Sequence, residues 1–286
     1  MPWRLTSDVE VYAARTGELL MSSPAEHTVP LTVLKEVRRG RRWSDEPMLF
    51  GWFEDGGEVR GAVLRTPPFE WLLGVVPEHA TAELVAALLA AGAEIPGVNG
   101  DVAGVDRFAE AWAAATGERG TTTLALDLYE LGTLRHPEPP PAGRARAADE
   151  TDMDVAVRLY TAFQVETPGP ATEALPTVRE RIDDRRLWLW EHESGVPVSL
   201  AARTAAVAGV ARIAPVYTPH EHRRHGYATA VTAACAADAL ARDAERVVLY
   251  TDLADPSANA MYQRIGFRPI GGRRVVRFTG TAKAAG

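Results

Sequence analysis

The chain has 286 residues, of which 46% are hydrophobic and 24% are charged, a composition typical of soluble globular proteins and a length sufficient for two domains. Its net charge of −7 argues against a general nucleic-acid binder, and no apolar stretch reaches the roughly 18 residues of a membrane-spanning helix, so no membrane partner is expected. Cys235 is the only cysteine, which excludes an intramolecular disulfide and predicts a cytoplasmic location.

A proline-rich segment divides the chain. Residues 134–143 read "LRHPEPPPAG", and a run of prolines can continue neither a helix nor a central strand. The segment therefore predicts an extended linker between a first half, residues 1–133, and a second half, residues 144–286.

The two halves repeat one order of predicted elements: helices, a hairpin, a strand, a helix, a strand, a helix and a strand. In the first half the patterned segments are 30–40, 48–55, 58–66, 70–76, 79–93, 105–117 and 121–131. In the second half they are 151–166, 174–184, 186–192, 198–205, 209–218, an alanine-rich helix to about 243, 246–252, 257–265 and 266–278. This order predicts an α/β fold of two domains in tandem, each with a twisted mixed sheet flanked by helices.

One short segment predicts a phosphate site. "HRRHGYATA", residues 222–230, places two arginines and a glycine between a predicted strand and a predicted helix. The first turn of a helix leaves backbone N–H groups without partners and carries partial positive charge, so it binds anions. The alternative is a solvated turn, but basic residues at a helix N-terminus are unfavourable without an anion.

The segment resembles the pyrophosphate loop of the GNAT acetyltransferase superfamily, Arg/Gln-x-x-Gly-x-Gly/Ala, at Arg223, Gly226 and Ala228. Its setting also resembles the family, because "IAPVYTPHEH" precedes it and "YTDLADPSANAMYQRIGFRPI" follows it. The resemblance covers residues 144 to about 279. It departs from the family where Arg224 and His225 replace a second small residue, and where Asp255 stands in place of an asparagine that the family often has.

The resemblance implies acetyl-CoA as the cofactor and assigns residues to it. The predicted cofactor-binding residues are Val216, Tyr217, Arg223, Arg224, His225, Gly226, Tyr227, Ala228 and Asn259. No metal site is expected, because the histidines lack the spacing of zinc ligands.

Tyr262 stands at the position of the family's general acid, and a phenol can donate a proton to a departing thiolate. The alternative is a tyrosine that only packs on the core. For the general base, Glu166 at the end of the first helix of the second half is the preferred candidate. Glu191 and Asp252 are alternatives, and each of the three also fits an ordinary surface or capping carboxylate.

The first half has no equivalent loop. After its third strand it reads "PEHATAELVAAL", with the acidic Glu78 and no glycine, so it resembles a GNAT domain that has lost the cofactor site. The alternative is a distinct α/β domain. The sequence thus predicts an acetyl-CoA-dependent N-acetyltransferase, monomeric or homodimeric, that acts on a primary amine of a small molecule or peptide. A catalytically silent CoA-binding regulatory or scaffold module is the alternative.

Overall fold

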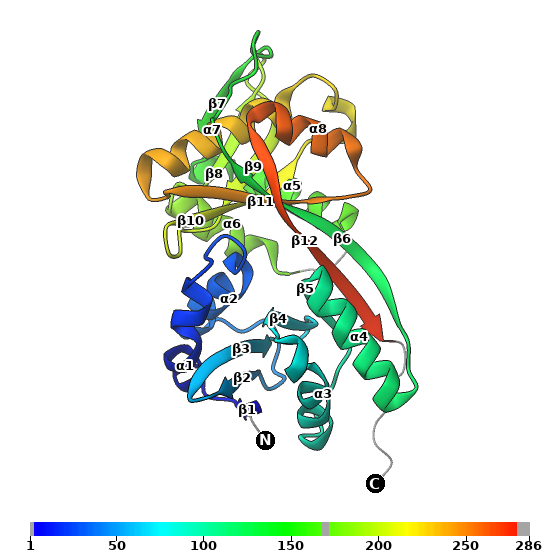
Figure 1. Ribbon diagram of the computed structural model, residues 1–286. Helices are drawn as coiled ribbons and strands as arrows, with labels where there is room; N and C mark the ends of the chain where they lie inside the picture. The colour runs from blue at the N-terminus through cyan, green and yellow to red at the C-terminus, as the bar shows by residue number, and fades with distance from the viewer. Residues whose placement is uncertain (1–2, 168–171, 279–286) are drawn as a thin grey trace. The chain divides into compact units, whose positions relative to one another are not determined.

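The computed structural model describes residues 3–167 and 172–278. The chain forms two compact units, of which the first comprises Met1–Leu126 and Gly271–Gly286 and the second comprises Asp127–Ile270. The division falls inside two long strands, β6 (Gly120–Leu131) and β12 (Phe267–Phe278), so each unit contains a part of both (Figure 1).

The first unit contains a mixed sheet in the order β1-β2-β3-β4-β5-β12-β6. Most neighbours are antiparallel, and β4 and β5 form a parallel pair. Its elements are β1 (Trp3–Thr6), α1 (Val9–Met21), α2 (Thr28–Arg38), β2 (Leu49–Asp55), β3 (Glu58–Arg65), β4 (Trp71–Val75), the 3₁₀ helix η1 (Glu78–Ala80), α3 (Thr81–Ala90), β5 (Gly97–Asp101) and α4 (Val102–Thr116).

The β2–β3 hairpin of the first unit forms where the sequence predicts it. Gly56 and Gly57 have φ of 58° and 87°, which only glycine adopts without strain and which match the twist of a two-residue hairpin turn. A buried cluster that includes Trp71, Leu84 and Phe108 packs α3 and α4 against the sheet.

The second unit repeats the arrangement in the order β12-β6-β11-β10-β9-β8-β7, and its parallel pair is β10 with β11. Its further elements are β7 (Arg144–Ala147), the 3₁₀ helix η2 (Glu150–Asp152), α5 (Met153–Glu166), α6 (Ala174–Asp183), β8 (Leu187–Glu191), β9 (Pro197–Arg203), β10 (Val210–Tyr217), the 3₁₀ helix η3 (His220–His222), α7 (Tyr227–Arg242), β11 (Arg246–Asp252) and α8 (Pro256–Ile265).

Alternating side chains give the sheet of the second unit two apolar faces. One face packs on α7 and α8, and Val198, Ala201 and Ile213 belong to its buried cluster. The opposite face packs on α5 and α6, and Leu200 and Tyr217 belong to that cluster. The predicted mixed α/β architecture is therefore confirmed, with helices on both faces of this sheet (Figure 1).

Three short strands, β1, β5 and β7, lie outside the segments predicted as strands from the sequence. β5 reads Gly-Val-Asn-Gly-Asp, a composition unfavourable for strands, yet it pairs with both β4 and β12. A Cβ atom at Gly97 would clash with the Val276 carbonyl oxygen, so the close approach of the neighbouring strand requires glycine there. β7 directly follows the proline-rich segment and pairs with β8.

Candidate functional site

The parallel pair of the second unit opens at the carboxyl end of its strands. β10 pairs with β11 from Val210–Arg246 to Ile213–Leu249, and among the described residues the pairing ends there although both strands continue. On its other side β10 keeps pairing with β9, at Val216–Ala201 and Tyr217–Leu200. The backbone of the last residues of β10 is therefore available on the β11 side for hydrogen bonds with an extended ligand.

The loop after β10 leads into an uncapped helix. After η3, Arg223 is extended, Arg224 has φ of 67° and Gly226, the N-cap of α7, has φ of 82°. Gly226 supplies no side-chain cap, and the first helical hydrogen bond runs from the Ala230 N–H to the Gly226 carbonyl at 3.1 Å. The N–H groups of residues 227–229 thus lack helical acceptors, which is the arrangement that binds anions.

Aromatic rings pack around the start of α7. The Tyr227 ring is buried, stacks on His225 at a centroid distance of 5.5 Å and lies 6.4 Å from the Trp190 ring. Tyr227 can therefore offer its backbone N–H to a ligand, while its side chain belongs to the core. Ala228, the next residue, is small and half-buried, which leaves room at the first turn of α7.

Arg223 is held by contacts that the sequence does not reveal. Its Nε donates to the Thr218 carbonyl at 2.9 Å, and its Nη2 donates to Glu166 Oε2 at 2.5 Å. The Tyr217 hydroxyl donates to the other oxygen, Glu166 Oε1, at 2.7 Å. These hydrogen bonds, that of Tyr217 first and that of Arg223 second, lower the pKa of the Glu166 carboxyl below its usual range. Glu166 therefore stays ionised at neutral pH and already has two partners.

Tyr262 and Asn259 lie three residues apart on α8, one turn of the helix. The Tyr262 ring is buried against Phe267, and burial, with a smaller contribution from Asp255, raises the pKa of its phenol. Within the described residues the hydroxyl makes no hydrogen bond. The phenol is thus protonated at neutral pH, the form that a proton donor needs.

Asn259 has one side-chain group without a partner. Its Nδ2 donates to the Asp252 carbonyl at 3.1 Å, whereas its Oδ1 is buried and accepts no hydrogen bond within the described residues. A buried acceptor without a donor costs free energy, about 1–3 kcal/mol, so the amide oxygen is suited to receive an N–H group from a ligand.

The other carboxylates considered from the sequence have structural roles. Asp255 is the N-cap of α8, and its Oδ1 accepts from the N–H groups of Ser257 and Ala258 at 3.0 and 2.9 Å. Glu191 pairs with Arg146 and Arg144, and their hydrogen bonds, that of Arg146 first, lower the pKa of its carboxyl.

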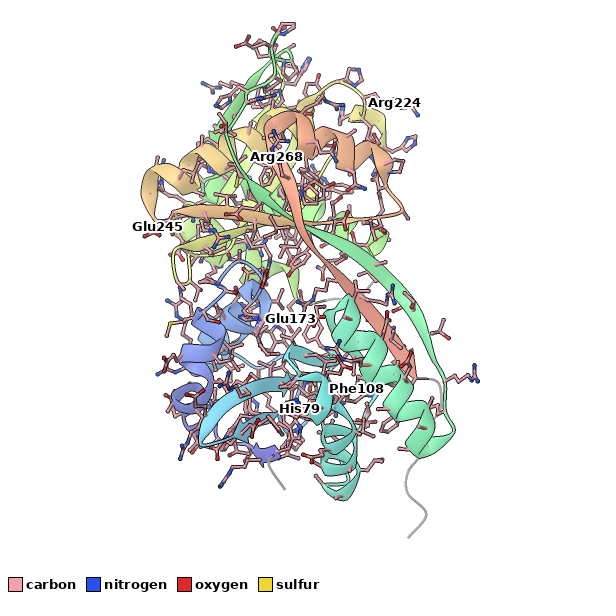
Figure 2. The ribbon with its side chains drawn as sticks, in the orientation of Figure 1. His79, Phe108, Glu173, Arg224, Glu245 and Arg268 are labelled. Atoms are coloured by element: carbon pink, nitrogen blue, oxygen red, sulfur yellow. The ribbon has the colours of Figure 1, made fainter. Side chains whose placement is uncertain are left out.

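The remaining polar residues near the site are placed as follows. Asp252 Oδ1 accepts from the Ala254 N–H at 2.8 Å. Cys235 is fully buried, and burial raises the pKa of its thiol to about 12, so it serves as a small apolar side chain in the core. Arg224 is exposed and points into solvent (Figure 2).

The structure thus brings some predicted residues into direct contact and separates others. Glu166, Tyr217 and Arg223 form one hydrogen-bonded group, and Gly226, Tyr227 and Ala228 begin α7. Val216 lies at the open end of β10 and is partly buried, and Asn259 and Tyr262 come from α8. The Thr218 carbonyl was missed from the sequence, because a backbone acceptor leaves no signal in residue identity.

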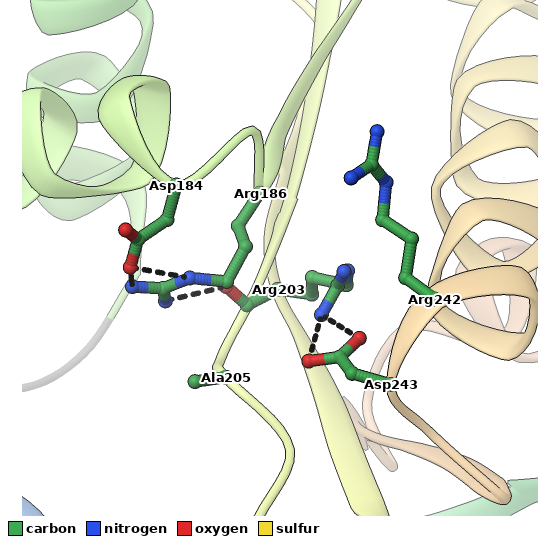
Figure 3. A pocket seen from close by; sticks show the side chains of 6 residues that line it. All are labelled: Asp184, Arg186, Arg203, Ala205, Arg242 and Asp243. Carbon is green, nitrogen blue, oxygen red and sulfur yellow. Dashed lines mark hydrogen bonds and ion pairs between the residues drawn. The ribbon is translucent and has the colours of Figure 1, made fainter.

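A separate polar cavity lies at the C-terminal end of α7. It has a volume of about 280 Å³ and is lined by Asp184, Arg186, Arg203, Ala205, Arg242 and Asp243 (Figure 3). Its guanidinium groups have carboxylate partners: Arg203 pairs with Asp238 and Asp243 at 3.3 and 2.9 Å, and Arg186 pairs with Asp184. This ion network joins β9 to α7 and already neutralises its arginines.

Within the described ranges, no group of three or more histidine, cysteine or carboxylate side chains is arranged to hold a metal ion. None of the helices in the described part of the chain combines the length and apolar character required to cross a membrane.

Comparison with known proteins identifies the family of the second unit. Residues 156–267 match the sequence model of the Acetyltransferase (GNAT) family, so the chain carries a GNAT-family domain there. The match includes the β10–α7 loop and α8, and it confirms the resemblance predicted from the sequence. No curated protein matches the sequence at a significant level.

Solved structures share the fold over nearly the whole chain. An acetyltransferase of the GNAT family from Colwellia psychrerythraea is 12% identical, with a TM-score of 0.61 and coverage of 97% of this chain and 99% of that one. A GCN5-related N-acetyltransferase from Sphaerobacter thermophilus is 18% identical, with a TM-score of 0.62 and coverage of 96% and 95%. A tandem GNAT protein from the clavulanic acid biosynthesis pathway is 13% identical, with a TM-score of 0.58 and coverage of 99% and 100%. At these identities the likeness shows the fold, including the GNAT-like fold of the first unit.

Proposed function

We propose that the chain transfers an acetyl group from acetyl-CoA to a primary amine of a small molecule or peptide, and that the second unit carries the site. One observation carries the proposal: the uncapped N-terminus of α7, reached through the Arg223–Gly226 loop, follows a strand that has separated from its parallel neighbour. An elongated ligand with a pyrophosphate and an amide-bearing arm fits such a site, because it needs anion-binding N–H groups and free strand backbone together.

A second feature supports the same ligand. The buried Asn259 Oδ1 lacks a donor within the described residues, and the pantetheine arm of CoA carries amide N–H groups that would satisfy it. The residues proposed to hold the cofactor are Val216, Tyr217, Arg223, Arg224, His225, Gly226, Tyr227, Ala228 and Asn259. Bound acetyl-CoA would supply an acetyl group activated as a thioester.

The chain's own contribution to the chemistry is positioning and a proton. The N–H groups at the start of α7 fix the phosphates, and the open end of β10 orients the arm. The Tyr262 phenol, protonated at neutral pH, donates its proton to the sulfur that leaves as the amine nitrogen bonds to the acetyl carbon.

The general base that would accept the amine's proton is the next question, and Glu166 is the residue predicted for it. Glu166, predicted as the base, is ionised, but its lowered pKa and its two hydrogen bonds make its carboxylate a weak base. An amine that arrives neutral, or that loses its proton to water, needs no strong base. The same observation favours the second candidate function, a CoA-binding module that transfers no acetyl group.

Two measurements on the purified protein test the proposal. Acetyl-CoA should raise the melting temperature, and an amine panel with acetyl-CoA should release free thiol for at least one acceptor. Stabilisation without thiol release across the panel would favour the binding module. Absence of stabilisation by either CoA or acetyl-CoA at millimolar concentration would contradict both functions.

A further inference from the structure

The two arginines of the β10–α7 loop have different surroundings. Arg223 makes a hydrogen bond with a carbonyl, an ion pair and a contact with an aromatic ring. Arg224 is exposed and has no partner among the described residues. The predicted phosphate-binding motif does not distinguish these roles, because its pattern specifies an arginine only at the first position.

The contacts of Arg223 direct its side chain to one side of the sheet. Its guanidinium carbon lies 5.9 Å from the centre of the Tyr217 ring, and its Nε and Nη2 bind the Thr218 carbonyl and Glu166. Tyr217 packs in the cluster of α5 and α6, whereas α7 packs in the cluster on the opposite face. Arg223 is therefore bound on the α5 side of β10.

Glu166 is itself fixed in place. It is the last residue of α5, and its two carboxylate oxygens accept from two different residues, Tyr217 at 2.7 Å and Arg223 at 2.5 Å. A carboxylate held from both sides sets the position of the guanidinium more closely than a single exposed ion pair would.

We propose that Glu166 is a positioning residue, which with Tyr217 and the Thr218 carbonyl braces Arg223 and thereby fixes the loop backbone for the pyrophosphate. Arg224 is then the arginine whose side chain meets the phosphates. This inference rests on the proposed function, since it assumes that CoA binds at this loop. It assigns to Glu166 a role different from that of a base.

The brace predicts a particular pattern of affinities. Glu166→Gln should raise the Kd for CoA about two- to fivefold, the range expected when a half-exposed ion pair that preorganises a site is lost. Turnover at saturating acetyl-CoA should stay unchanged, so that KM changes and kcat does not. If Glu166 acted as the base, Glu166→Gln would lower kcat and leave KM unchanged.

A double-mutant cycle measured by calorimetric titration with CoA tests the coupling. We expect Arg223→Met to raise Kd, and we expect Glu166→Gln to add nothing in the Arg223→Met background, because the carboxylate acts through that arginine. Arg224→Met should raise Kd independently of Glu166. Glu130→Gln is the matched control, because it removes another partly exposed glutamate–arginine pair of the second unit, with Arg246, and should leave Kd unchanged.

Hydrogen exchange of the loop amides, residues 218–228, tests the brace without any ligand. Glu166→Gln should accelerate exchange in this segment relative to the intact chain and to Glu130→Gln. Equal exchange in all three proteins would overturn the brace, whether or not CoA binds.

The cycle also has outcomes that overturn the inference. Additive effects of Glu166→Gln and Arg223→Met, tighter CoA binding by Glu166→Gln, or a lower kcat with unchanged Kd would each contradict it. If the intact chain binds no CoA, the proposed function fails, and the exchange measurement still decides whether Glu166 braces the loop.

Discussion

The two units differ in the segment that connects the first strand of the parallel pair to the next helix, β4 to α3 in the first unit and β10 to α7 in the second. In both, a strand of the parallel pair is followed by a proline and a short 3₁₀ helix, with Pro77 before η1 and Pro219 before η3. In the first unit α3 begins directly at Thr81, whereas in the second unit Arg223–Gly226 come before α7. The four extra residues hold both positive-φ positions and both arginines, and they are the segment that we propose to bind the pyrophosphate.

The helices that follow the second strand of each parallel pair, α4 and α8, also differ between the two units. α4 and α8 both begin at an aspartate N-cap, Asp101 and Asp255. Seven residues after the cap, the first unit has Phe108 and the second has Tyr262, and four residues after it they have Val105 and Asn259. Where the second unit carries a hydroxyl and an unpaired amide oxygen, the first unit has fully buried apolar side chains. The comparison supports the prediction that only the second unit binds a cofactor.

The largest expected effect concerns Tyr262 and its counterpart Phe108. Tyr262→Phe gives the second unit the residue of the first, and we expect kcat to fall about a hundredfold because the proton donor is lost. The Kd for CoA should change little. As a control, Tyr12→Phe alters another buried tyrosine, in the first unit, and should leave kcat unchanged. A Tyr262→Phe variant with full kcat would remove the proposed acid.

A second prediction compares two left-handed glycines at helix ends. Gly226 and Gly117 have φ of 82° and 78°, and a Cβ atom would meet nothing closer than 3.8 Å at either position. Alanine should therefore cost about 1–2 kcal/mol of backbone strain in both, and lower Tm by a few degrees. Only Gly226→Ala should weaken CoA binding, about tenfold, in a calorimetric titration. If the two variants bound CoA equally well, the left-handed conformation at Gly226 would not be needed for CoA binding.

A third prediction concerns Asn259, whose replacement should weaken CoA binding without lowering the stability of the fold. Asn259→Leu removes the buried oxygen that lacks a donor, and also the hydrogen bond to Asp252, with little change in volume. We expect unchanged or slightly higher stability in denaturant unfolding, and an increase of about three- to tenfold in the Kd for CoA. Weaker stability with unchanged affinity would show that Asn259 serves only the fold.

The smallest expected effect is the pH dependence of the Glu166 pair. Because the folded-state pKa of Glu166 lies below its unfolded value of about 4.3, its contribution to stability is present above that value and is lost as the pH falls through the folded pKa. Glu166→Gln should lower Tm by about 1–2 °C at pH 7, and the difference should vanish in acid. A difference that persists to pH 2 would contradict the assignment.

The sequence predicted the parts of this picture that depend on local pattern. The β2–β3 hairpin follows from alternation around Gly56-Gly57, and the loop that leads into α7 follows from small and basic residues before an alanine-rich helix. The residues of β5 could not be located from the sequence, because its glycines are required by the approach of neighbouring strands and weaken any local strand signal. The unit division, which assigns Gly271–Gly286 to the first unit, depends likewise on strand pairing between distant segments.

The same limit applies to the site. Glu166 and Arg223 are 57 residues apart, and their contact exists only because β10 lies beside the end of α5. The sequence could name both residues but could not pair them, and it gave no reason to include the Thr218 carbonyl. Residue types are thus predictable from a motif, whereas the contacts that orient them come from the fold.

The most direct test of the central claim is a calorimetric titration of CoA into the intact chain and into a variant that lacks Arg223–Gly226, which gives the second unit the connection of the first. We predict one CoA per chain for the intact protein and no measurable binding for the shortened loop, with both proteins showing the same cooperative unfolding. Two CoA molecules per chain, or undiminished binding by the shortened variant, would contradict the account.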